Sequence, residues 1–283
     1  MKKLKLVFAT LLFAGLFFTA CKKTAETSVL EEPLSIEEAT SISEEIVEAE
    51  ATFEEAEFTA NEELDVILNG PPPPGDCPTI TKDQAQGVFP VTVTIDFGDN
   101  CVSPNGKTRS GKIIITLSAK PMTPGATKIM TFEDFVVDEK AIEGVRTWTN
   151  NGKDAQGRPS WTRTTTGAKI TWPNGDMKSW GADHTVLQTA GFTTPLLKID
   201  NEFEITGSRS VVRKDGSTFA SVITAPLLKK HICPWIVSGV REVTRNGNTV
   251  TLDYGNGDCD KFGTVTMPDG STKQIKLKKW RHH

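Results

Sequence analysis

The chain contains one unusual pattern twice, and each copy begins and ends with a cysteine. In both copies, Cys-Pro leads into an alternating apolar segment that ends Thr-Val-Thr, an aliphatic residue, Asp, an aromatic residue and Gly. A second cysteine follows within a few residues, so the copies run from Cys77 to Cys101 and from Cys233 to Cys259. We interpret them as an internal repeat of a disulfide-closed β unit, a pattern that a chain of unrelated segments would not produce by chance.

The first twenty residues have the features of an export signal. Three lysines precede an apolar run from Leu6 to Phe18, which is too short to span a membrane as a helix, so residues 1–20 are predicted to be a signal peptide. The segment from Phe18 to Cys21 resembles a bacterial lipobox, which implies lipidation of Cys21 and attachment to a membrane. The alternative is an ordinary secretory signal that happens to precede a cysteine. By analogy with other lipoproteins, Lys22 favours the outer membrane, facing the periplasm or the cell surface.

Four cysteines remain after Cys21, and four cysteines allow three pairings. The repeat selects Cys77–Cys101 with Cys233–Cys259, and an exported protein lies in a compartment where disulfides persist. A zinc ion held by four thiolates is the alternative, but the chain has no Cys-x-x-Cys pair.

The mature arm, residues 21–76, is strongly acidic. From Thr24 to Asp76 it has 16 acidic residues and no Lys or Arg, whereas the rest of the chain carries a basic surplus. A capping box at Ser35 and Glu38, followed by apolar residues at helical spacing, predicts an amphipathic helix over about 36–68, and the prolines at 71–74 stop it. The alternative is a disordered acidic tether. If the arm is helical, its acids could meet the surplus bases of the body.

Beyond the prolines the hydrophobic period changes from about 3.6 to 2, and Asn-Gly or Asp-Gly turns separate the segments. The pattern predicts a mainly β fold, an antiparallel meander built as a rolled sheet, a sandwich or an open barrel. A weak stretch at 190–197 suggests two β halves, 77–195 and 196–283, although one continuous domain fits equally well. The predicted strands are 90–97, 109–118, 127–137, 141–149, 159–165, 167–172, 177–187, 202–213, 217–224, 235–245, 248–254, 261–267 and 271–278.

Catalytic patterns are scarce in this sequence. There are four histidines, of which His184 lies in a predicted strand and His231 lies close to a bridging cysteine. We predict no catalytic residues and no cofactor. Acidic residues at the two repeat turns could hold calcium, but Asp in tight turns more often bonds its own backbone. The weak calcium candidates are Asp96, Asp99, Asp253, Asp258 and Asp260.

Four of the six tryptophans, Trp148, Trp161, Trp172 and Trp180, fall in one span. On one face of neighbouring strands they would form a platform for sugars or other flat ligands, and otherwise they are core and rim residues. The register of the turn at Asn174-Gly175 decides between these. A two-residue turn would place Trp172 and Trp180 on opposite faces, whereas a three-residue turn would pair Trp180 with Ile170 and bring both tryptophans to one face.

Basic residues near the C-terminus suggest a possible partner. Lys273, Lys276, Lys278, Lys279 and Arg281 could meet an anionic envelope glycan, lipid head groups or another envelope protein, although a solvated sheet face explains them equally well. Nucleic acid is not expected as a partner outside the cytoplasm.

The segments Thr94–Gly98, Asn105–Ile114, Gly239-Val240 and Leu252–Gly255 resemble uncharacterised β-rich lipoproteins of Bacteroidota. The resemblance covers most of 77–279 and implies a compartment and an architecture only. The sequence therefore predicts a membrane-anchored envelope lipoprotein that acts as a non-enzymatic binding or structural module. The alternative is a glycan-acting hydrolase or lyase that uses paired carboxylates on the sheet.

Overall fold

The computed structural model describes residues 34–69, 77–102, 106–194 and 197–279, all of which belong to one compact unit. The predicted signal peptide at 1–20, the lipidation site Cys21 and the proline stop at 71–74 lie outside the described residues.

The acidic arm forms one long helix, α1, spanning Ile36–Asn69. Ser35 caps it, because the backbone N–H of Glu38 donates to the Ser35 hydroxyl at 3.2 Å and so satisfies one of the free donors of the first turn. The predicted helix is therefore confirmed, and the disordered tether is wrong for the described part of the arm. The apolar stripe is buried along its length at Ile42, Ile46, Ala49, Phe53, Ala56, Ala60 and Leu64.

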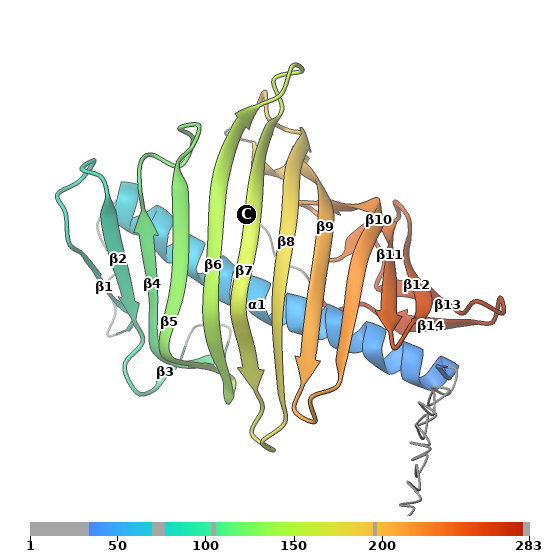
Figure 1. The fold of residues 1–283 in the computed structure, drawn as a ribbon. Helices are drawn as coiled ribbons and strands as arrows, with labels where there is room; N and C mark the ends of the chain where they lie inside the picture. The colour runs from blue at the N-terminus through green and yellow to red at the C-terminus, as the bar shows by residue number, and fades with distance from the viewer. Residues whose placement is uncertain (1–33, 70–76, 103–105, 195–196, 280–283) are drawn as a thin grey trace, which may run out of the picture. The chain divides into compact units, whose positions relative to one another are not determined.

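The rest of the described chain forms a single antiparallel sheet whose strands follow one another in chain order, except that β2 pairs directly with β4 and the short β3 pairs only with β4. The sandwich alternative is therefore wrong, and the sheet is not closed into a barrel, because β1 and β14 form its two edges (Figure 1). The strands are β1 (Thr79–Lys82), β2 (Val91–Asp96), β3 (Cys101–Val102), β4 (Thr108–Leu117), β5 (Thr127–Val137), β6 (Lys140–Lys153), β7 (Pro159–Thr171), β8 (Met177–Ala190), β9 (Glu202–Arg213), β10 (Thr218–Lys230), β11 (Ile236–Arg245), β12 (Asn248–Asn256), β13 (Phe262–Thr266) and β14 (Thr272–Lys276).

The sequence missed some details of this sheet. The short strands β1 and β3 were not predicted, and the predicted strands 159–165 and 167–172 form one strand, β7. A register shift between Thr165 and Ala168 marks a bulge at that point, which interrupts the alternation without ending the strand. A short 3-10 helix at Lys198–Asp200, η1, precedes β9.

Pairing between β8 and β9 carries the sheet past the boundary that the sequence suggested near residue 195. The two strands pair from Lys178 with Arg213 to Ala190 with Glu202, with one irregularity near Gln188. Hydrogen bonding is thus continuous between the segments that the sequence analysis assigned to separate halves.

Helix α1 lies against one face of the sheet and crosses the strands (Figure 1). Its beginning approaches the late strands, since Glu38 pairs with Arg245 of β11. Its end approaches the early strands, since Arg109 of β4 donates to the hydroxyl of Thr59 at 3.1 Å. Side chains from β4 at one end to β11 at the other therefore reach the helix.

Glycines at bulges allow neighbouring strands to approach closely beneath the helix. Gly144 of β6 has a φ of +123°, and a Cβ there would lie 2.6 Å from the Cα of Ala168. Gly207 of β9 has a φ of +125°, and a Cβ there would lie 2.0 Å from the carbonyl oxygen of Asp183. A side chain at either position would collide with the next strand, so these bulges, which bend a sheet, require glycine.

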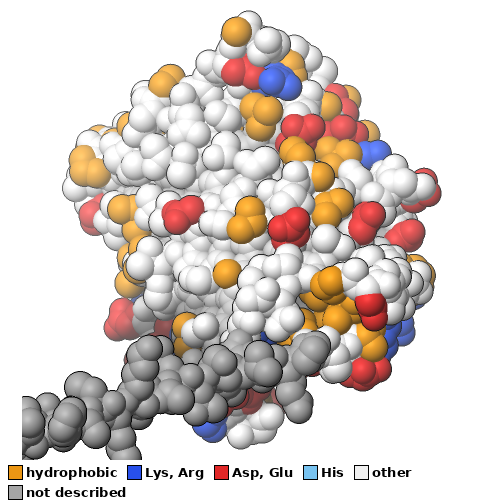
Figure 2. Space-filling view, turned by 45° about the vertical axis from the view of Figure 1, so that its right-hand side comes forward, with side chains coloured by type: hydrophobic (Ala, Val, Ile, Leu, Met, Phe, Trp, Pro, Cys, Tyr) orange, Lys and Arg blue, Asp and Glu red, His pale blue; other side chains and the backbone are white. Residues whose placement is uncertain are grey.

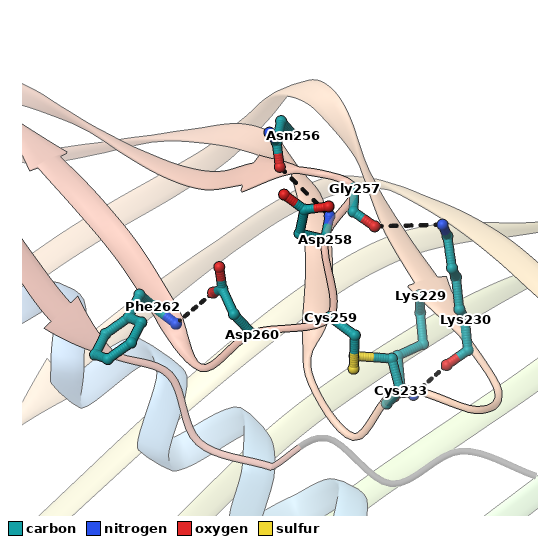
Figure 3. The surroundings of a disulfide bond; sticks show 9 residues. All are labelled: Lys229, Lys230, Cys233, Asn256, Gly257, Asp258, Cys259, Asp260 and Phe262. Atoms are coloured by element: carbon teal, nitrogen blue, oxygen red, sulfur yellow. Dashed lines mark hydrogen bonds between the residues drawn. A yellow bond between two sulfur atoms is a disulfide. The ribbon is translucent and has the colours of Figure 1, made fainter.

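Both predicted disulfides are present, and each closes the open end of a hairpin. Cys77–Cys101 encloses β1 and β2, and Cys233–Cys259 encloses β11 and β12 (Figure 3). The four-thiolate zinc site is therefore wrong. The first strands of the two hairpins have 4 and 10 residues, so the structure does not establish a repeat of the whole unit.

Candidate functional site

The helix-facing side of the sheet carries a row of buried arginines. Arg146 of β6, Arg163 of β7, Arg209 of β9 and Arg241 of β11 are at most 4% exposed. Each occupies an inward position of its strand, in phase with buried residues such as Val211 two positions after Arg209. A charge that occurs in phase with the core is the sequence signal that could have revealed this row, and the sequence analysis missed it.

Three glutamates on one side of α1 meet these arginines. Glu50, Glu54 and Glu57 are spaced i, i+4 and i+7, so they project from the same helix face. Glu50 Oε1 lies 2.8 Å from Arg209 and 2.9 Å from Arg241.

Glu54 Oε1 lies 2.8 Å from the Nη1 atoms of both Arg146 and Arg163. Glu57 bridges Arg146 and Lys128 of β5, both at 2.8 Å. The expectation that acids of the arm would meet bases of the body is therefore confirmed.

The ion pairs determine the charge states of these groups. Burial alone would raise the pKa of Glu50, but Arg209 and Arg241 outweigh that effect and hold its pKa below the ordinary value. Burial would also raise the pKa of Glu57, but the positive charges of Lys128 and Arg146 outweigh burial and lower this pKa strongly. Burial lowers the pKa of Arg209 to about 10, still far above neutral pH. Glu50, Glu57 and Arg209 are thus charged near pH 7.

The buried glutamates of α1 and the bases that they contact form what we call the ion-pair layer. His184 of β8 lies within this layer as a neutral base. Its Nδ1 is 3.3 Å from Arg163 Nη2, and it is 3% exposed. Burial, together with the positive charges of Arg163, Arg209, Arg241 and Arg146, lowers its pKa well below 6.5. A buried base surrounded by cations is poorly placed to accept a proton from a substrate.

A cavity lies between the later part of α1 and strands β5–β9. It has a volume of about 270 Å³ and is lined by Trp148, Trp161, Phe58 and Phe203, with the polar residues Gln188 and Asn201. Glu54, Glu57 and Lys128 of the ion-pair layer also border it. Aromatic walls with a few polar groups are typical of small-molecule sites.

A second cavity of about 210 Å³ adjoins the first and has a more apolar lining. It shares Trp148, Trp161, Lys128 and Asn61 with the first cavity. Its remaining walls include Leu64, Leu117, Pro121 and Ala126. We refer to the two cavities together as the tryptophan site, with a polar compartment (the first) and an apolar compartment (the second).

The four predicted platform tryptophans point to the helix-covered side of the sheet but do not form one surface. Trp148 and Trp161 line the tryptophan site. Trp180 is 3% exposed and makes an edge contact with Phe53 of the helix, and Trp172 packs against the core. The platform therefore reduces to two tryptophans, and the other two are core and rim residues.

The register at the turn before β8 explains the facing of Trp172 and Trp180. The backbone N–H of Trp172 donates to the carbonyl of Asp176 at 2.9 Å, which leaves a three-residue turn. Trp180 consequently lies across from Ala168 instead of the expected Ile170. Ala168 and Ile170 alternate in step with Trp172, so Trp180 lies on the same face as Trp172, as expected for a three-residue turn and not for a two-residue turn.

The calcium candidates behave as turn residues. Asp96, Asp253 and Asp260 each accept a hydrogen bond at 2.8 Å from a backbone N–H two residues later (Figure 3 shows Asp260). Asp258 donates its own N–H to Asn256 at 3.4 Å. Within the described ranges, Asp99 included, no three His, Cys, Asp or Glu side chains are grouped as a metal site.

Two of the C-terminal bases, Lys278 and Lys279, border a cavity of about 190 Å³ beside Glu48 and Glu55 of α1. Lys273, Lys276, Lys278 and Lys279 are exposed, and Arg281 lies outside the described residues. On the side of the molecule in Figure 2, Lys and Arg side chains are few, and several lie close to Asp or Glu side chains. Several bases of the body lie instead beneath the helix.

Comparison of the chain with protein-family models, curated proteins and solved structures returns no match. In the part of the chain that the structure describes, no helix combines the length and the apolar character needed to cross a membrane.

The ion-pair layer predicts the effect of removing one charge. Glu50→Gln keeps the shape of the side chain but leaves Arg209 and Arg241 buried without an anion, so we expect a loss of about 3–5 kcal/mol in the free energy of unfolding. Glu44→Gln is the matched control, since Glu44 is an exposed glutamate of the same helix, and its effect should stay within about 0.5 kcal/mol. Urea unfolding measures both variants, and equal effects would contradict the layer.

The depressed pKa of His184 predicts acid sensitivity. In the unfolded chain His184 takes up a proton below about pH 6.5, whereas in the native chain it stays neutral at that pH. The free energy of unfolding is therefore highest above about pH 6.5 and declines as the pH falls below it. The slope should approach about 1.4 kcal/mol per pH unit, before the glutamates contribute a similar loss below about pH 4.5. Unfolding free energies of the wild type and His184→Gln between pH 7 and 5 measure the effect. A wild-type slope no steeper than that of the variant would contradict it.

Proposed function

We propose that the chain is a lipid-anchored protein of the cell envelope that works as a non-enzymatic binding module. The observation that supports it is the tryptophan site, where Trp148 and Trp161 line a cavity of about 270 Å³ with amide side chains beside them. The lipobox-like segment ending at Cys21 and the two disulfides support the envelope location. Outer-membrane attachment through Cys21 is part of the proposal.

The charge states at the site favour binding over the alternative of glycoside hydrolysis. A hydrolase needs one carboxylic acid with a raised pKa and a second carboxylate as base or nucleophile. Glu54 and Glu57 border the polar compartment, but Glu54 pairs with two arginines, and the pKa of Glu57 is lowered. A carboxyl group held in its charged form is a poor proton donor.

We also propose that the two disulfide-closed hairpins descend from one duplicated unit. Asp96 and Asp253 form the same turn bond, each at 2.8 Å, directly before a buried aromatic residue, Phe97 or Tyr254. These matched ends of β2 and β12 support the duplication.

The lipid anchor predicts a simple biochemical difference. In a bacterial host with a lipoprotein pathway, the wild-type chain should incorporate labelled palmitate and sediment with membranes, because several acyl chains hold a protein on a bilayer. Cys21→Ser should lose the label and leave the membrane fraction. Label retained in Cys21→Ser would remove the anchor from the proposal.

The binding role predicts which tryptophans matter. A glycan and lipopolysaccharide screen of the protein should give a ligand whose affinity falls about tenfold or more in Trp148→Ala and Trp161→Ala, because each change removes an aromatic wall of the cavity. Trp172→Ala is the matched control, since Trp172 faces the same side outside the residues that line the site. Equal loss in all three variants, or binding unchanged in all three, would contradict the assignment of the site.

A further inference from the structure

Three hydrogen-bonded polar side chains, Lys128, Glu57 and Asn61, join the sheet to the helix at the tryptophan site. Lys128 Nζ of β5 donates to Glu57 Oε1 at 2.8 Å and to Asn61 Oδ1 at 2.9 Å, both on α1. Lys128 and Asn61 border both compartments, as do Trp148 and Trp161. A ligand in either compartment therefore lies beside the same two tryptophans, Trp148 and Trp161.

The charges that border the site already have partners. Lys128 pairs with Glu57, Glu57 also with Arg146, and Glu54 with Arg146 and Arg163, in each case at 2.8 Å. A charged ligand group would have to break one of these pairs or stay unpaired in a desolvated place, and both are costly. The site therefore favours an uncharged ligand.

The polar compartment has the groups that recognise a sugar ring. Indole faces pack against the C–H groups of a ring, and amide side chains both donate to and accept from hydroxyl groups. Gln188 Nε2 donates to Asn201 Oδ1 at 2.9 Å, which fixes two amides beside the tryptophans.

The apolar compartment has different walls. Leu64, Leu117, Pro121 and Ala126 form much of its surface, and Leu117 and Ala126 are buried. Such walls bind hydrocarbon, at about 25 cal/mol per Å² of apolar surface removed from water. The side chains of these four residues offer no hydrogen bond to a sugar hydroxyl, although Thr127 and Asn150 also border the compartment.

From this partition we propose that the tryptophan site binds an uncharged glycoside that carries a hydrocarbon group, with the sugar ring in the polar compartment and the hydrocarbon in the apolar one. The inference rests on the proposed binding function and names its class of ligand. A protein held at a membrane by its own lipid would meet such amphiphiles at the membrane surface.

Titration calorimetry with short alkyl glycosides tests the inference. The protein is the full chain carrying Cys21→Ser, so that no acyl group of its own competes, and the probes are hexyl and octyl β-glucoside at concentrations where they are monomeric. Octyl β-glucoside should bind about sixteenfold more tightly than hexyl β-glucoside, because it has two more methylenes and each buried methylene contributes about a fourfold gain. Octyl sulfate and octyl phosphocholine should bind at least tenfold more weakly than octyl β-glucoside.

Two variants assign the compartments separately. Ala126→Phe fills the apolar compartment and should abolish the gain from hexyl to octyl, whereas Gln188→Leu should abolish the preference for glucoside over phosphocholine. Trp172→Ala should change neither. Thermal unfolding of each variant shows whether it keeps the fold.

The outcomes separate this inference from the proposed function. Equal affinity for octyl sulfate, octyl phosphocholine and octyl β-glucoside would overturn the glycoside assignment. If Trp161→Ala then abolished the binding of all three, the tryptophan site would still be the place where they bind. Binding of glucose as tight as that of octyl β-glucoside would overturn the hydrocarbon part. If none of these probes binds but the glycan and lipopolysaccharide screen still finds a ligand sensitive to Trp148 and Trp161, the inference falls and the proposed function stands. If that screen finds no ligand either, both fall.

Discussion

The fold depends on the charge match between one helix and one face of a sheet. A single sheet with a solvated outer face must cover its inner face, and here one helix, α1, packs against it. The apolar stripe of α1 supplies the burial, but much of that stripe is alanine, at Ala49, Ala56 and Ala60. Small side chains let the helix approach the strands closely, although they would fit almost as well one turn further along. The glutamates remove this ambiguity.

Buried ion pairs are weak evidence for stability, because desolvation costs about as much as the attraction returns. Their better attested effect is to specify register, since a shift by one turn would leave several charges unpaired. Glu50, Glu54 and Glu57 meet their arginines only when α1 crosses the strands at its observed position. Glu54, Glu57 and Lys128, which take part in these ion pairs, also border the tryptophan site. The site is therefore held by the interaction that fixes the helix.

Much of the architecture was readable from the sequence, for identifiable reasons. The helix followed from apolar spacing with a capping serine, and the meander followed from Asn-Gly and Asp-Gly turns between alternating segments. Both disulfides followed from the duplicated pattern. Local sequence patterns did not indicate which residues would pack against each face of a strand. The arginines appeared as a general basic surplus, because a residue inside a strand does not reveal which charge will cover it.

The candidate site shows the same limit more sharply. The sequence predicted one platform of four tryptophans, yet of these four only Trp148 and Trp161 line the cavity. The position of α1 decides which of the inward-facing tryptophans the helix covers. Trp180 meets Phe53 of the helix at a ring distance of 5.5 Å, whereas Trp148 lies further along, where Phe58 and Asn61 of the helix border the same cavity. The space beside Trp148 thus lies beyond the contact that Phe53 makes with the sheet. A site of this kind belongs to the fit between two elements, so it becomes visible only when both are in place.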